Sequence, residues 1–160
     1  SFDSDKTEVY LAEDKSRIGF AYSYYKDFMD GRYIINNYET NDRELQADYV
    51  NVTFILNAPK YDQKEVYVVG GFNNYGTNSG SVMRYETAIN KYLGTTLLKQ
   101  GQYNYRYMTK DNKTNSKSET DLEGSFSVTQ NVYDVLVYFR PFGSISDRLI
   151  GYSMVNYNGR

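Results

Sequence analysis

Apolar and polar residues alternate along most of the chain after residue 49, with the two-residue period of a β-strand. Every second residue of segment 50–56 is apolar, and Asn51 and Thr53 lie between them, so one face of this strand is predicted to be buried. Segment 65–72 is an apolar run that ends in the pair Gly70-Gly71, and it is typical of a central strand buried on both faces.

Further strands are predicted over 82–85, 92–98, 102–108, 134–140 and 148–155, with turn residues between them and no convincing amphipathic helix. This pattern predicts an all-β fold, an antiparallel immunoglobulin-like β-sandwich over residues 49–160. Segment 109–125 holds one large apolar residue, Leu122, so we expect an exposed hairpin tip or a mobile loop there.

Residues 1–48 carry their own strand signals. Segments 17–25 and 32–37 flank Asp30-Gly31, a dipeptide that favours a tight hairpin turn. We therefore expect an N-terminal β-hairpin extension, which either enlarges the sandwich or is the remnant of a preceding domain.

The composition excludes several classes of function. The 160 residues include no cysteine and no histidine, so disulfides, thiolate or histidine catalysis and most transition-metal sites are excluded, and we expect no metal and no cofactor. A net charge of -2 gives no nucleic-acid footprint, and no apolar stretch is long enough to span a membrane. The 19 tyrosines, beside 8 phenylalanines and no tryptophan, favour sheet.

Pairs of carboxylates are the remaining route to catalysis, since a glycosidase needs only two of them at the right separation. Candidates at predicted strand ends or in loops are Glu65, Glu86, Asp134 and Asp147. Acids in such places on a sandwich are usually solvated, so the sequence predicts a protein that is not an enzyme.

The string from Val66 to Tyr75, followed by the segment from Leu97 to Tyr107, resembles early-set immunoglobulin-like domains, a group that includes glycogen-binding modules. In those modules an aromatic after Phe-Asn-Asn stacks on sugar and a basic residue on the later strand assists. The resemblance places these roles on Tyr75 and Arg106, with Asn73 and Asn74 as neighbouring ligand or partner contacts. A second stacking aromatic normally follows the later strand, but segment 109–118 has none. The competing interpretation is structural: Phe72 in the core, and Asn73 and Asn74 closing a turn.

A second resemblance covers nearly the whole chain. It is carried by Glu123-Gly124-Ser125, Thr129-Gln130-Asn131, the segments 135–141 and 147–152, and earlier blocks at 48–52, 71–74 and 98–101. These blocks resemble the C-terminal part of the plug protein family of the type IX secretion system. That likeness implies a periplasmic or cell-envelope protein without enzymatic activity that closes an outer-membrane protein translocon. Members of the family are longer and begin with another β-rich domain, so we expect this chain, which starts Ser1-Phe2-Asp3, to be a mature or excised part of a longer secreted protein.

Two hypotheses follow from these observations. The first is a non-catalytic module that binds a protein, an outer-membrane translocon by the resemblance, through the loops 73–81 or 109–125. The alternative is a carbohydrate-binding module of glycogen-binding type that uses Tyr75 and Arg106.

Overall fold

A computed structural model describes residues 7–20, 29, 31–37, 45–126 and 131–157. Spatial contacts between residues divide the chain into two compact units. The first consists of residues 1–20 and 27–125, and the second consists of residues 21–26 and 126–160. The predicted boundary at residue 48 falls inside the first unit. Residues on both sides of that boundary thus share one unit.

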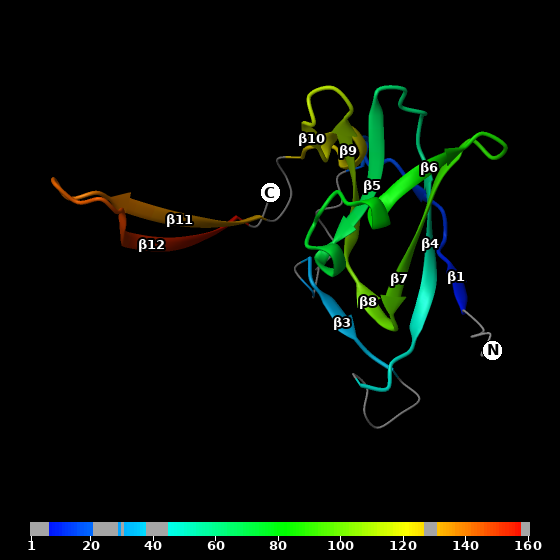
Figure 1. The fold of residues 1–160 in the computed structure, drawn as a ribbon, viewed down its shortest axis with the longest axis horizontal. Coiled ribbons are helices and arrows are strands. Elements are labelled where there is room, and N and C mark those ends of the chain that lie inside the picture. The colour runs from blue at the N-terminus through cyan, green and yellow to red at the C-terminus, as the bar shows by residue number, and fades with distance from the viewer. Residues whose placement is uncertain (1–6, 21–28, 30, 38–44, 127–130, 158–160) are drawn as a thin grey trace. The chain divides into compact units, whose positions relative to one another are not determined.

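A mixed eight-stranded sheet dominates the first unit (Figure 1). Its strands are β1 (Glu8–Tyr10), β2 (Asp14–Lys15), β4 (Tyr49–Asn57), β5 (Lys64–Gly70), β6 (Val82–Glu86), β7 (Lys91–Lys99), β9 (Tyr105–Asp111) and β10 (Lys117–Ser118). The order across the sheet is β1, β4, β7, β6, β5, β9, β10, and β2 also pairs with β4. Among the described strands β1 and β10 do not pair with each other, so the sheet is not a closed barrel.

Smaller elements complete this unit. The strands β3 (Tyr33–Ile35) and β8 (Gly101–Tyr103) form an antiparallel pair, and two short 3-10 helices, η1 (Gly71–Asn73) and η2 (Ser79–Ser81), follow β5. A one-turn helix, α1 (Thr120–Glu123), follows β10.

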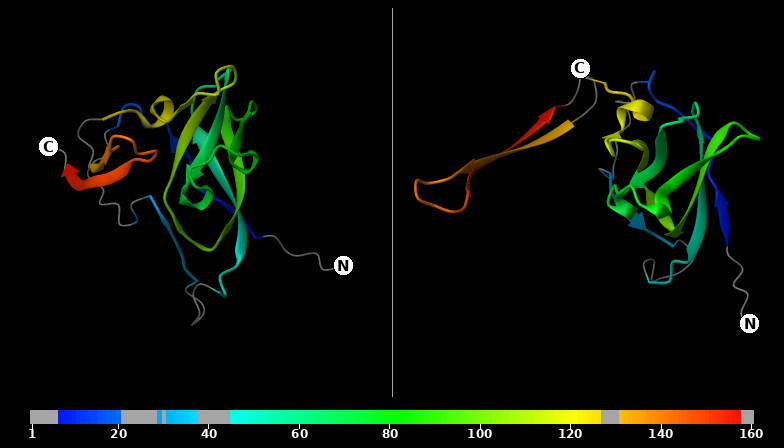
Figure 2. Two further views of the ribbon diagram at one scale, coloured as in Figure 1. Left: turned by 60° about the vertical axis from the view of Figure 1, so that its left-hand side comes forward. Right: turned by 45° about the horizontal axis from the view of Figure 1, so that its top comes forward.

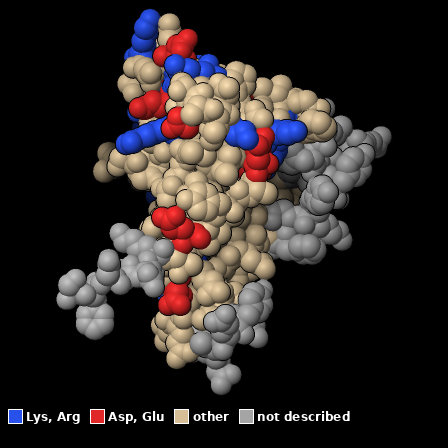
Figure 3. Space-filling model, turned by 90° about the vertical axis from the view of Figure 1, so that its right-hand side faces the viewer, with Lys and Arg blue, Asp and Glu red and all other residues tan. Residues whose placement is uncertain are grey.

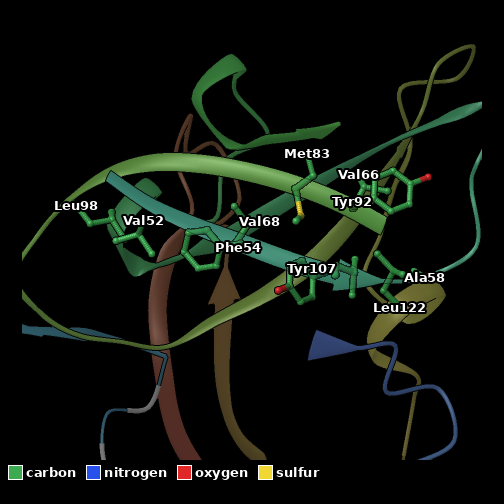
Figure 4. Packing of buried hydrophobic residues seen from close by; sticks show 11 residues of the cluster. Val52, Phe54, Ala58, Val66, Val68, Met83, Tyr92, Leu98, Tyr107 and Leu122 are labelled. Atoms are coloured by element: carbon green, nitrogen blue, oxygen red, sulfur yellow. The ribbon is translucent and has the colours of Figure 1, made fainter. Parts of the chain in front are cut away.

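The core lies between two halves of the folded sheet (Figures 2 and 4). Strand β6 joins the halves, because its first residues pair with β5 and its last residues pair with β7. Both halves and α1 contribute to one cluster: Val52, Phe54, Leu56, Ala58, Val66, Val68, Met83, Tyr92, Leu98, Tyr107 and Leu122. The alternation predicted for segment 50–56 is confirmed, since Val52, Phe54 and Leu56 are all buried.

The sheet is mixed rather than antiparallel throughout, because two N-terminal strands that the sequence did not predict join it in parallel. β1 and β2 both run parallel to β4, with Glu8 opposite Asn51 and Asp14 opposite Leu56. β1 has three residues, one of them charged, and β2 is the charged pair Asp14-Lys15, so both are too short to show an alternation. Their position covers a sheet edge that would otherwise present unpaired backbone groups.

The expected N-terminal hairpin is partly outside the described residues, which omit 21–28 and Asp30. The described strand of that region, β3, pairs with β8. The predicted strand over 102–108 is divided at Asn104 into β8 and β9. This division lets β8 pair with β3 and β9 pair with β5.

The prediction of an exposed segment over 109–125 is wrong at both ends. Thr109 belongs to β9 and is buried, and Leu122 and Glu123 of α1 are also buried. The middle is exposed, from Asn112 to Lys117. A single buried apolar side chain, that of Leu122, is enough to hold α1 in place, because the helix packs over the end of the core.

The second unit contains an antiparallel hairpin of β11 (Asn131–Phe139) and β12 (Arg148–Tyr157). Both strands were predicted, with shorter bounds. No helix among the described residues is long and apolar enough to cross a membrane.

Candidate functional site

The glycine pair Gly70-Gly71, at the end of β5, determines the path of the chain through the predicted site. A Cβ on Gly70 would lie 2.4 Å from the carbonyl oxygen of Asn104, so only glycine allows the end of β5 to pass the β8–β9 junction this closely. The chain then turns through η1 and brings Phe72 against Phe54, with ring centroids 6.3 Å apart. Phe72 is half-buried and packs against the core cluster, so the structural interpretation of this residue holds in part.

Asn73 closes the turn with both ends of its amide. Its Oδ1 accepts a hydrogen bond from the Gly70 N–H at 2.9 Å, and its Nδ2 donates to the Val68 carbonyl at 3.0 Å. The next two residues, Asn74 and Tyr75, have φ of 52° and 54°, the left-handed region, which asparagine tolerates better than most residues. The side chain of Asn73 therefore stabilises the loop. The left-handed conformation of Asn74 and Tyr75 sets the direction in which the Tyr75 ring points.

Tyr75 and Arg106 do come together. The guanidinium carbon of Arg106 lies 4.9 Å from the ring centroid of Tyr75, within the range of a cation–π contact. Arg106 also forms an ion pair with Glu119 at 2.8 Å, and the Tyr75 hydroxyl donates to the Gly31 carbonyl. One face of the aromatic ring is thus occupied by a guanidinium that is itself held by a carboxylate.

Beneath this pair lies a second, smaller apolar cluster on the other face of β5 and β9. It consists of Tyr67, Val69 and Met108, with Tyr75 and Val82 packed against it. Burial, together with a hydrogen bond from its hydroxyl to Glu65, raises the pKa of Tyr67 to about 12. The loop after β5 consequently acts as a cover for a sheet face.

A polar cluster that the sequence did not reveal connects the N-terminal strands to the core. The Asp14 Oδ2 accepts hydrogen bonds from the hydroxyls of Tyr105 and Tyr107, each at 2.7 Å. Burial and the hydrogen bond to Asp14 raise the pKa of both tyrosines. Arg17 donates to the Glu123 Oε2 at 3.1 Å, and the Glu123 Oε1 accepts from the Tyr107 N–H at 2.7 Å. The alternation of tyrosines along 103–107 was visible in the sequence, but nothing in it pointed to Asp14.

Asp121 organises the other side of α1. It forms an ion pair with Lys64 at 2.6 Å and accepts a hydrogen bond from the Thr109 hydroxyl at 2.5 Å. These two partners lower the pKa of Asp121. The side chain is therefore held as a carboxylate that ties α1 to β5 and β9.

The four carboxylates considered for catalysis are each engaged locally. Glu65 accepts from Tyr67, Glu86 accepts from the Ala88 N–H, Asp134 accepts from Tyr152, and Asp147 pairs with Arg140. In the part of the chain that the structure describes, no group of three acidic side chains could hold a metal ion.

The outward face of β1, β4 and β7 carries exposed apolar side chains. The core takes alternate residues of β4 and β7, so Tyr49 and Leu97 point away from it, with exposed fractions of 64% and 60%. Tyr10 of β1 pairs with Thr53 on the same outward face and is 66% exposed. Thr53 and Thr95 lie between them and share a hydrogen bond of 2.8 Å. Figure 3 shows the side on which β1 and β4 lie in Figure 1, where charged side chains of both signs are scattered and a wide area between them is uncharged.

A comparison with known proteins finds a similar solved structure. The chain is similar to the crystal structure of a hypothetical protein from Parabacteroides merdae ATCC 43184, with 35% sequence identity and a TM-score of 0.83. The similarity covers 98% of this chain but only 39% of that protein. No family model and no curated protein sequence matches the chain.

Proposed function

We propose that this chain is a non-catalytic, protein-binding part of a longer periplasmic or cell-envelope protein, which closes an outer-membrane translocon as the type IX plug family does. The resemblance of the sequence blocks supports the family, and the partial coverage of the solved relative supports a longer protein. The folded sheet corresponds in this proposal to an early-set immunoglobulin-like sandwich, to which β1 and β2 add two parallel strands.

The observation that carries the proposal is the exposed face of β1, β4 and β7. A side chain with an apolar body and a polar tip suits an interface that is dry at its centre, and tyrosine is enriched at such surfaces. Tyr10 and Tyr49 both belong to this class, and Leu97 lies opposite Asn51 on the neighbouring strand.

Charged groups lie beside the exposed tyrosines of this face, as is usual on a protein-binding surface. Tyr10 donates a hydrogen bond of 3.0 Å to Glu8, and the Lys99 ammonium lies 5.9 Å from the ring centroid of Tyr49. Asn51 and the hydrogen-bonded pair of Thr53 and Thr95 lie among the apolar side chains of this face, and non-obligate protein interfaces have such a mixed composition. The rigid strands hold these side chains in place, which limits the entropy lost on binding.

The lowered pKa of two carboxyl groups supports a role without catalysis. A general acid near neutral pH needs a raised pKa, which burial without a charged partner produces. Hydrogen bonds and Lys64 instead lower the pKa of Asp121, and backbone N–H donors of Thr114 and Lys113 lower the pKa of Asp111.

Binding of the purified translocon, in detergent and from the bacterium that encodes this chain, tests the proposal. We expect the double variant Tyr10→Ser/Leu97→Ser to raise Kd at least about tenfold, equivalent to about 1.4 kcal/mol. The matched control is Ile89→Ser, which removes an exposed apolar side chain from the β6–β7 turn and should leave Kd unchanged. The proposal fails if the translocon does not bind, or if the double variant binds as well as the control.

A further inference from the structure

The hairpin of β11 and β12 is a well-formed local element. Residues pair in antiparallel register from Asn131 opposite Tyr157 to Phe139 opposite Arg148, with one bulge beside Val137. At its turn Arg140 binds Asp147 through two parallel hydrogen bonds of 2.7 and 3.0 Å. The geometry of the hairpin is therefore fixed by its own contacts.

Apolar side chains cover both faces of this hairpin. The alternation places Val135 and Val137 on one face and Leu136 and Tyr138 on the other. The large apolar residues of the two strands are all between 46% and 64% exposed: Val132, Tyr133, Val135, Leu136, Val137, Tyr138, Phe139, Leu149, Ile150, Tyr152, Met154 and Val155. At the turn, Phe142 and Ile145 are almost completely exposed.

Such a surface belongs in the interior of a larger sheet. A two-stranded hairpin is marginally stable in water, and folded proteins rarely leave large contiguous apolar patches uncovered. Strands that are apolar on both faces are typical of sheets covered on both sides. A single covering layer would still leave one face of this hairpin in water.

The edges of the hairpin point to the same conclusion. Edge strands that remain exposed are usually protected by lysine, proline or inward charges. Neither strand contains lysine or proline, and the charged residues within them are Asp134 and Arg148. Asp134 is bound by the Tyr152 hydroxyl at 2.9 Å. These edges are suited to pairing with further strands.

We propose that β11 and β12 are inserted as two strands into a domain built mainly from the part of the longer protein that lies outside these 160 residues. The comparison supports this occupant: the similar solved protein has a part that matches 98% of this chain, and that part is only 39% of its length. A domain on the same polypeptide meets the hairpin at a high effective concentration. A second copy packed face to face would cover one face of each hairpin and leave the other exposed. This inference is independent of the proposed translocon.

Cysteine accessibility in the longer natural protein tests the insertion, because residues 1–160 contain no cysteine of their own. Ser153→Cys, opposite Val135 in the hairpin, is a conservative probe of one face. Thr87→Cys in the exposed β6–β7 turn is the control, and any other cysteine of the longer chain is replaced by serine. We expect the monomeric protein to react with a fluorescent maleimide at least about tenfold more slowly at the hairpin than at the turn.

Two outcomes would overturn the inference. Equal labelling rates at the two positions in the folded monomer would mean that the hairpin is open to solvent. Protection that disappears on dilution, together with a monomer–dimer equilibrium in sedimentation, would identify a second copy as the occupant. If Ser153→Cys does not fold, Val137→Cys on the same face replaces it, and the same rates decide.

Discussion

At the scale of single residues, the structure is tied together by buried polar contacts that join distant parts of the chain. Asp14 receives two tyrosine hydroxyls from β9, and Arg17 reaches Glu123 of α1. Buried hydroxyls need partners, since an unpaired one costs on the order of 1–3 kcal/mol. Asp14 therefore stabilises the N-terminal strands and the interior of β9 together.

Replacing Asp14 tests this role. Asp14→Ala leaves the hydroxyls of Tyr105 and Tyr107 without their acceptor, so we expect a loss of roughly 2–5 kcal/mol in the free energy of unfolding. Asp14→Asn keeps an acceptor oxygen and should cost about half as much. Urea denaturation measures both, with Asp48→Ala, an exposed acid, as the control. Equal stability of Asp14→Ala and the control would contradict this assignment.

The buried tyrosines also predict how stability changes at alkaline pH. The pKa of Tyr67, Tyr105 and Tyr107 is raised above the ordinary value of 10 in the folded protein. Above pH 10 the unfolded chain releases these protons and the folded chain keeps them, so stability falls as pH rises. Each such tyrosine contributes up to about 1.4 kcal/mol per pH unit.

Urea denaturation between pH 9 and 11.5 measures this slope. Tyr67→Phe removes one titrating group, so its alkaline slope should be shallower than that of the wild type once the unfolded tyrosine ionises. A variant slope equal to the wild-type slope would show that Tyr67 ionises equally in both states.

At the scale of elements, strands with a long alternation of apolar and polar residues could be predicted from the sequence, and the shortest strands could not. The runs that became β4, β5, β6 and β7 carry enough apolar residues to show which face is buried. β1 and β2 are short, and their parallel pairing depends on an open edge of β4 that no local pattern reveals. Similarly, α1 depends on one apolar residue, Leu122, and on polar partners from distant strands.

The same distinction applies to the candidate site. The spacing of Gly70, Phe72 and Asn73 was enough to predict a turn with an aromatic residue in the core. The resemblance assigned Tyr75 and Arg106 to one ligand site, and their side chains are in contact in the structure. Their contacts with Gly31 and Glu119 could not be predicted, because these join segments that are remote in sequence.

At the scale of the whole molecule, the predicted binding loops 73–81 and 109–125 contain one aromatic residue, Tyr75, where sugar-binding platforms present several. We expect calorimetric titration with malto-oligosaccharides to give affinities near or weaker than about 1 mM, since one stacking contact and one charged hydrogen bond contribute ~1–3 kcal/mol each. Arg106 already covers one face of the Tyr75 ring. Micromolar binding that is lost in Tyr75→Ala would instead establish the carbohydrate-binding alternative.

The parallel pairing of β1 with β4 has a consequence for the order of folding. Glu8 and its partner Asn51 are 43 residues apart, within the range of 36 to 50 residues that separates the paired residues of β4 and β7, so the two pairings close loops of similar length. The N-terminal strand leaves the ribosome first, yet it has no place to dock until β4 has been made. β1 is therefore already available when β4 is made, and its docking closes this edge of β4 before the edge can pair with another nascent chain.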